Sequence, residues 1–118
     1  MSNLIIIPSL NPDNKLVNII KELKENKIND IIVIDDGSTK KEIFDKLDVP
    51  VIHHEVNKGK GAAIKTALKE YNKYYKDITG FITADDDGQH SIKDIVNINN
   101  KLNNNVIFGV RNFKGKDV

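Results

Sequence analysis

Short apolar runs that alternate with helical segments constrain the fold of this chain more than any other feature. Five runs are continuous in apolar character rather than alternating, and they cover residues 4–7, 31–34, 49–52, 78–83 and 106–108. Continuous runs of this length are typical of strands that are buried on both faces of a parallel sheet. The sequence therefore predicts a mostly parallel α/β sheet.

Amphipathic segments separate these runs. Apolar residues recur at helical spacing over residues 16–23, 43–47, 64–71 and 92–102. This regular alternation predicts an open, Rossmann-like sheet with right-handed crossovers and helices on both faces, which makes three α/β/α layers. In such sheets, ligands bind beyond the carboxyl ends of the strands.

Capping residues predict where three of the helices begin. Asn11 stands directly before a proline, and Thr39 and Ser91 each stand three residues before an acidic residue. Asn, Thr and Ser accept hydrogen bonds from the first amides of a helix. We therefore expect N-caps at Asn11, Thr39 and Ser91.

Composition excludes several classes of function. The 118 residues include 18 Lys plus Arg and 17 Asp plus Glu, a formal net charge of +1 that gives no electrostatic reason to expect nucleic-acid binding. The absence of cysteine excludes disulfides, thiolate metal sites and thiol nucleophiles. The length predicts one domain over residues 1–118, and the lack of a signal-peptide pattern or long apolar run predicts a cytoplasmic location.

The acidic residues after the fourth apolar run are the most informative local feature. Asp85, Asp86 and Asp87 are adjacent, and like charges this close repel unless a cation or donors offset them. Asp85 and Asp87 can both reach one hard divalent ion, and Gln89 offers a further oxygen, which indicates Mg²⁺ or Mn²⁺. The alternative is a solvated acidic turn.

A second acidic pair, Asp35 and Asp36, follows the second apolar run and precedes Gly37. A carboxylate at a strand end accepts hydrogen bonds from a base or ribose in nucleotide-binding folds. Asp-Gly is also a common turn sequence, so ordinary turn chemistry explains this pair equally well.

Two basic features lie at the same predicted edge. Residues 57–63 combine two glycines and two lysines before a helical segment, and Arg111 follows the fifth run. Helix-terminal amides and arginine both bind phosphate, although a glycine-rich turn with solvated side chains fits as well. His53 and His54 are expected to pack or face solvent rather than ligate metal, whereas His90 is a candidate ligand contact.

Five segments in order resemble the N-terminal, nucleotide-binding part of family 2 glycosyltransferases with the GT-A fold. They are residues 5–11, 32–39, 57–63, 85–90 and 109–111. The Asp-Gly-Gln-His sequence in the fourth segment most resembles polyprenyl-phosphate sugar transferases, including dolichol-phosphate mannosyltransferase-like enzymes. The resemblance implies inverting, metal-dependent transfer of a sugar from a UDP- or GDP-linked donor. The implied acceptor is a polyprenyl phosphate or a glycan, as in cell-envelope polysaccharide biosynthesis.

The resemblance also assigns roles to residues. Pro8 and Leu10 would line the base and ribose pocket, and Asp36 would bind the nucleobase. Asp85 and Asp87 match the family's Asp-x-Asp metal motif, with help from Gln89. The implied nucleotide-sugar site comprises Pro8, Ser9, Leu10, Asp35, Asp36, Gly37, Lys60, Asp85, Asp86, Asp87 and Arg111, with Asp85, Asp87 and Gln89 as the Mg²⁺ or Mn²⁺ ligands.

The resemblance further implies a catalytic base beyond Val118, so no residue of this sequence is assigned as catalytic. We therefore expect a truncated transferase that binds its donor but is inactive alone, and whose full-length form lies at the inner face of the membrane. An exposed sheet edge would favour homo-oligomers. The alternatives are a non-catalytic nucleotide-sugar-binding domain and a phospho-receiver domain. The receiver is disfavoured because Pro8 and Ser9 stand where its acidic pair would be.

Overall fold

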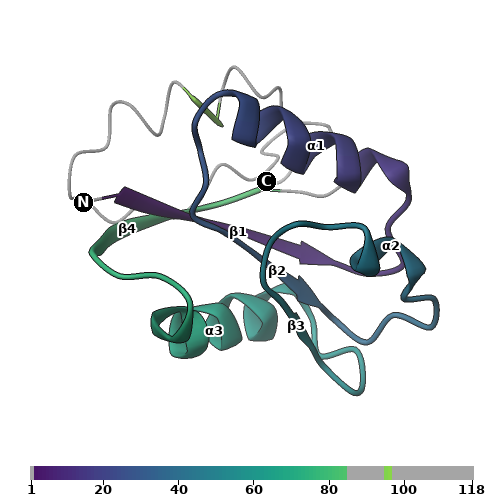
Figure 1. The fold of residues 1–118 in the computed structure, drawn as a ribbon. Coiled ribbons are helices and arrows are strands. Elements are labelled where there is room, and N and C mark those ends of the chain that lie inside the picture. The colour runs from purple at the N-terminus through teal and green to yellow at the C-terminus, as the bar shows by residue number, and fades with distance from the viewer. Residues whose placement is uncertain (1, 85–94, 97–118) are drawn as a thin grey trace, which may run out of the picture.

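The computed structural model describes residues 2–84 and 95–96. In this part of the chain, four parallel strands form one sheet in the order β3-β2-β1-β4 (Figure 1). The strands are β1 (Ser2–Ser9), β2 (Ile31–Asp35), β3 (Val51–His53) and β4 (Ile78–Thr83). The helices are α1 (Asn14–Glu25), α2 (Glu42–Asp45), α3 (Lys60–Glu70) and a 3-10 turn (Tyr71–Lys73). The predicted open, parallel α/β sheet is confirmed.

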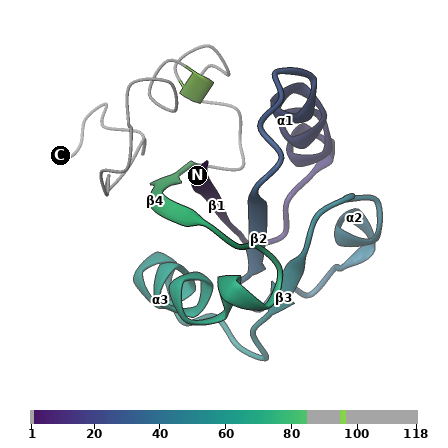
Figure 2. The same ribbon diagram turned by 60° about the vertical axis from the view of Figure 1, so that its left-hand side comes forward.

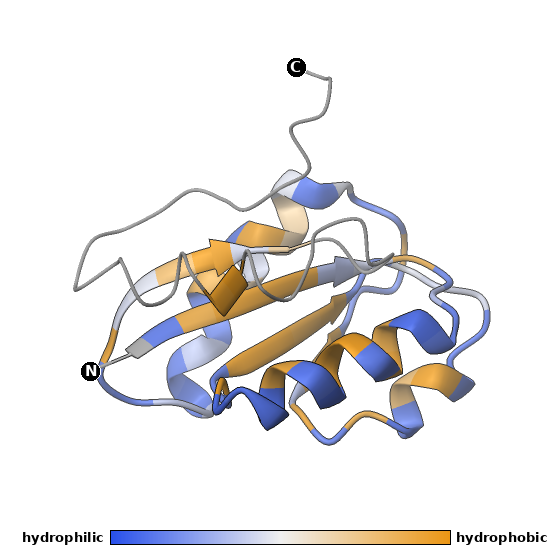
Figure 3. Cartoon of the chain, turned by 90° about the horizontal axis from the view of Figure 1, so that it is seen from above, coloured by the Kyte–Doolittle hydropathy of each residue, from blue (hydrophilic) through white to orange (hydrophobic). Residues whose placement is uncertain are grey.

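Helices cover both faces of this sheet. The alternating side chains of β1 enter two separate cores, because successive residues of a strand point to opposite faces. Ile5 and Ile7 pack with α1 and α2, whereas Leu4 and Ile6 pack with α3. Figure 2 shows α3 across the sheet from α1 and α2, and Figure 3 shows that the strands are mostly apolar whereas the helices carry both apolar and polar residues.

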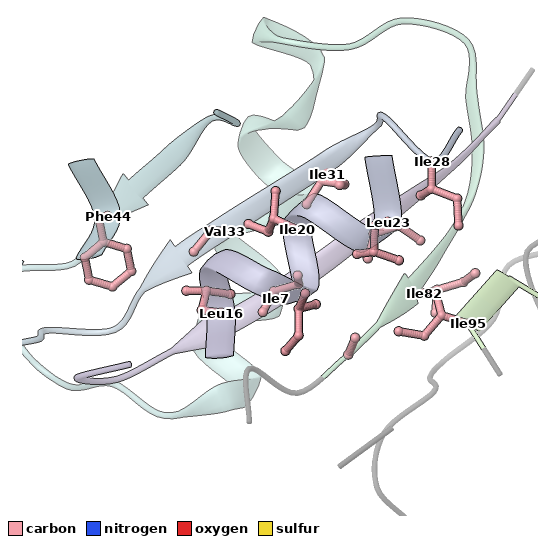
Figure 4. Packing of buried hydrophobic residues seen from close by; sticks show 13 residues of the cluster. Ile7, Leu16, Ile20, Leu23, Ile28, Ile31, Val33, Phe44, Ile82 and Ile95 are labelled. Carbon is pink, nitrogen blue, oxygen red and sulfur yellow. The ribbon is translucent and has the colours of Figure 1, made fainter. Parts of the chain in front are cut away.

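The larger core lies under α1. Leu16, Ile20 and Leu23 of this helix are buried against strand residues such as Ile7 and Ile31 (Figure 4). Burying side chains of this size contributes about 1.5–3 kcal/mol each. This core fixes α1 on the sheet and so fixes the loop that joins β1 to α1.

The strand register brings three loops together at one edge. Ser9 lies beside Asp35 in the β1–β2 ladder, and Asp35 lies beside His53 in the β2–β3 ladder. All three residues are the last of their strands, so the loops after β1, β2 and β3 leave the sheet side by side. This is the carboxyl edge at which the sequence predicts a ligand.

Two of the predicted helix caps are wrong. The N-cap of α1 is Asp13, whose carboxylate accepts from the amide of Lys15, and α2 begins after Lys41 without a side-chain cap. Asn11 instead accepts from the amides of Thr39 and Lys40 and from the Thr39 hydroxyl, at 3.0–3.2 Å. Asn11 and Thr39 therefore join the β1–α1 loop to the β2–α2 loop. The third predicted cap, Ser91, lies outside the described residues.

The last predicted elements fall mostly outside the described residues as well. The strand predicted over 106–108 and most of the helix predicted over 92–102 lie there, and Ile95 and Val96 are helical. Among the residues that the structure describes, no helix has the length and apolar character that a membrane span needs.

Candidate functional site

A pocket of about 280 Å³ opens at the carboxyl edge of the sheet. Its walls come from the loop after β1, the loop after β2 and the loop that leads into α3. Five predicted site residues meet in it, together with two neighbours from the segment 57–63. The lining residues are Pro8, Ser9, Leu10, Asp36, Asn57, Gly59 and Lys60.

Asp36 supplies the carboxylate of this pocket. Its Oδ1 accepts from His54 Nδ1 at 2.9 Å and from the Lys58 amide at 2.8 Å. Its Oδ2 accepts from the Gly59 amide at 2.8 Å. Burial opposes ionisation, but these hydrogen bonds outweigh it and hold the pKa of Asp36 below its ordinary value. Asp36 is therefore an anion at neutral pH that ties β2 to the loop before α3.

Asp35 is directed away from the pocket. Its buried carboxylate accepts from the Ser38 amide at 2.8 Å and from His53 Nδ1 at 2.6 Å, and Lys41 Nζ lies 3.7 Å away. Burial opposes its ionisation, but the hydrogen bonds from Ser38 and His53 prevail and lower the pKa of Asp35. The residue shapes the loop after β2 and is absent from the pocket walls. A direct contact between Asp35 and a nucleotide sugar therefore stays a prediction.

Two glycines allow the loops to approach each other. Gly37 has φ +85°, and a Cβ there would lie 2.5 Å from the amide nitrogen of Asn57 and the carbonyl carbon of Val56. Gly59 caps α3 with φ +94° and ψ 163°, a conformation that only glycine adopts readily. Gly37, which the sequence placed in the site, therefore acts through its backbone, by letting the loop after β2 contact the loop after β3.

Ser9 is a lining residue of the pocket with a buried side chain. The residue is 3% exposed, and its Oγ has no hydrogen-bond partner among the described residues. An unsatisfied buried hydroxyl is unusual, because buried hydroxyls normally have a hydrogen-bond partner.

The predicted metal motif lies outside the described residues. This applies to Asp85, Asp86, Asp87 and Gln89, and also to Arg111. The described chain reaches the same sheet edge at the end of β4, where the Ala84 amide donates to the Ile6 carbonyl at 2.9 Å. Within residues 2–84 and 95–96, no three acidic or histidine side chains gather as a metal site would require.

His53 ends β3 and His54 follows it. The sequence predicts that both pack or face solvent, and in the structure each one pairs with an aspartate. His54 binds Asp36, and His53, which is also packed edge-on against Phe44 at 5.6 Å between ring centroids, binds Asp35. The available signal in the sequence was an Asp-Asp pair at the end of one predicted strand and a His-His pair at the end of the next. The sequence does not show that these two strands lie side by side in the sheet.

Comparison with known proteins gives consistent matches. A family model described as glycosyl transferase family 2 matches residues 4–117. An uncharacterized protein of Methanocaldococcus jannaschii is 38% identical over 93 residues, which cover 77% of this chain and 37% of that protein. A second uncharacterized protein of that organism is 33% identical over 123 residues, with 92% and 52% covered.

A third relative has a functional name. The UDP-N-acetylglucosamine–dolichyl-phosphate N-acetylglucosaminyltransferase of Methanococcus voltae is 32% identical over 113 residues, which cover 80% of this chain and 44% of that protein. The chain thus spans about half or less of the length of these curated relatives. No solved structure gives a significant match.

Proposed function

The chain belongs to glycosyl transferase family 2, and on this premise we propose that it carries the donor site for transfer of a sugar from a nucleoside diphosphate sugar to an acceptor. The observation that carries the proposal is the pocket at the carboxyl edge. There, the ionised Asp36, Pro8, Leu10 and Lys60 line one cavity. This is where ligands bind in open α/β sheets.

The number of hydrogen-bond acceptor sites that remain unused on the Asp36 carboxylate favours uracil over guanine as the bound base. A carboxylate has about four lone-pair sites, two on each oxygen. Oδ1 accepts two hydrogen bonds, and among the described residues Oδ2 accepts one. One site remains, which suits the single imide N–H of uracil better than the two adjacent donors of guanine. The name of the Methanococcus voltae relative, which specifies a UDP-linked donor, supports the same preference.

The apolar groups of the β1 loop complement a uridine. Pro8 and Leu10 offer apolar surface to the faces of the base and ribose. Lys60, in the first turn of α3, adds positive charge beside a ligand that is an anion. We assign these residues to the uridine diphosphate part of the donor.

Asp85 and Asp87, assisted by Gln89, would hold the divalent ion of the donor complex. Hard oxygen ligands of this kind suit Mg²⁺ or Mn²⁺. When bound, the ion offsets negative charge on the leaving diphosphate. In this proposal the Asp86 backbone supports the motif and Arg111 contacts the donor phosphates or sugar. By analogy with the named relative, the acceptor is a polyprenyl phosphate such as dolichyl phosphate.

The first test is a calorimetric titration of the chain with UDP and with GDP, each with and without Mn²⁺. We expect Mn²⁺ to strengthen binding and UDP to bind more tightly than GDP. Asp36→Asn should weaken UDP binding about tenfold or more, because it removes the charged acceptor. Asp87→Ala should remove the effect of Mn²⁺. The matched control is Asp45→Asn, an exposed α2 residue, which should bind UDP as the wild type does. Absence of binding at millimolar nucleotide would contradict the proposal.

A further inference from the structure

A buried histidine connects the carboxylate of the pocket to helix α3. His54 follows β3 directly and is 7% exposed. Its Nδ1 lies 2.9 Å from Asp36 Oδ1, and its Nε2 lies 2.8 Å from Thr66 Oγ1 of α3. Its backbone amide donates to the Asp35 carbonyl at 2.7 Å. Both ring nitrogens are therefore engaged, and the ring has one orientation.

The direction of the hydrogen bond to Asp36 follows from the chemistry of its partner. An ionised carboxylate only accepts, so the proton of this hydrogen bond resides on His54 Nδ1. Together with the Lys58 amide, this donor fills the acceptor sites of Oδ1. The carboxylate is then held so that the remaining acceptor site is on Oδ2, the oxygen beside Gly59.

His54 does not line the pocket itself, so it acts on a ligand only through Asp36. We propose that His54 is a positioning residue of the donor site: its Nδ1–H orients Asp36 for the nucleobase, and Thr66 holds the ring from α3. This inference rests on the proposed function. It adds that helix α3 and the base-binding carboxylate are coupled through one imidazole.

The Asp35–His53 pair provides an internal comparison. It is also a carboxylate–imidazole pair, and each member precedes its counterpart by one residue in the sequence. His53 Nδ1 lies 2.6 Å from Asp35 Oδ2. Because strand residues alternate between faces, this pair lies on the other side of the sheet, beside Phe44 of α2. Neither member lines the pocket. A general effect of losing a histidine would weaken UDP binding at both positions. Loss of the orientation of Asp36 would weaken it only at His54.

Two substitutions of His54 test the contributions of its two ring nitrogens separately. The side-chain nitrogen of asparagine takes approximately the place of Nδ1, and that of glutamine takes the place of Nε2. His54→Asn therefore keeps the donor to Asp36 and loses the Thr66 contact, whereas His54→Gln does the reverse. We expect His54→Gln to weaken UDP binding about tenfold, the effect of one hydrogen bond to a charged group. His54→Asn and the matched control His53→Gln should bind UDP nearly as the wild type does.

Readouts without nucleotide make failure of this inference distinguishable from failure of the proposed function. Carboxyl-carbon NMR should show Asp36 titrating below its ordinary range in the wild type and in His54→Asn, and at a higher pH in His54→Gln. Imidazole-nitrogen NMR of the wild-type chain should show a proton on His54 Nδ1, a result that needs no variant to fold. An unprotonated Nδ1, or equal effects of His54→Asn and His54→Gln, would overturn the inference. A wild type that binds no nucleotide but shows the expected Asp36 titrations would overturn the donor site alone.

Discussion

Neighbouring residues of one type have different tasks in this protein. Asp35 and Asp36 are both buried, ionised and paired with a histidine. Only Asp36 lines the pocket, because the chain direction at the end of β2 places successive side chains on opposite faces of the sheet. At the scale of the residue, position in the strand therefore decides function more than residue type does.

Three glycines, two in the site loops and one in α3, allow a graded test of backbone conformation. Gly37→Ala should be the most destabilising, at more than about 2 kcal/mol, because it adds a close backbone contact to a positive φ. A Cβ at Gly59 would meet no atom of the described residues within 4 Å, so Gly59→Ala should cost about 1–3 kcal/mol through φ and ψ alone.

Gly61→Ala is the matched control, since Gly61 lies in the first turn of α3 and a Cβ there would meet no atom of the described residues within 4 Å. It should stabilise the protein by about 0.5–1 kcal/mol, because alanine favours the helix. Urea unfolding of the three variants measures the series. Equal effects at Gly37 and Gly61 would contradict the loop geometry.

At the scale of the element, the helix starts depend on competition among polar residues. Asn11, Pro12 and Asp13 precede α1, and both Asn11 and Asp13 are good capping types. Asn11 adopts φ +46° and binds the β2–α2 loop, which leaves Asp13 to cap the helix. The helix thus begins two residues later than the capping pattern alone predicts.

Replacement of the observed cap tests this assignment. Asp13→Ala should lower the free energy of unfolding by about 1 kcal/mol, because the first turn of α1 loses its side-chain acceptor. Asp13→Ser should retain most of the stability, since serine also caps. Thermal unfolding of both variants measures the difference. A stable Asp13→Ala variant would show that the hydrogen bond to Lys15 contributes nothing.

At the scale of the molecule, two buried carboxylates link stability to pH. The pKa values of Asp35 and Asp36 are both lower in the folded state than their ordinary value. The unfolded chain therefore binds more protons in the acid range, and stability rises with pH there. Their contribution is present above about pH 4 and is lost as the pH falls through the folded-state values.

Asp36→Asn should reduce this dependence. We expect the variant to be less stable than the wild type at pH 7, with the difference shrinking as the pH falls below about 4. The slope of unfolding free energy against pH should fall by at most about 1.4 kcal/mol per pH unit, the limit for one proton. Urea unfolding from pH 2 to 7 measures the two curves. A constant difference across this range would show that the pKa of Asp36 is the same in the folded and unfolded states and is not lowered by folding.

The sequence alone predicts the strands where apolar runs are uninterrupted. The run at 31–34 corresponds to β2, and the run at 78–83 coincides with β4. The run at 49–52 is shifted, since β3 covers Val51–His53. Pro50 has no amide to donate to a ladder, so the strand begins after it. The three pocket walls were also predicted, because strand ends and glycine-rich turns have a local signature.

The tertiary structure decided which of these strand ends touch. The pairing of β2 with β3 places His53 beside Asp35 and brings His54 to Asp36. Strand order and register depend on how the two helix layers pack on the sheet, and this information is spread over the whole chain. Apolar periodicity is local and reports burial, so it determined the layers of this protein. Contacts between loops far apart in sequence form only when the layers assemble, so only the fold determined the site's hydrogen bonds.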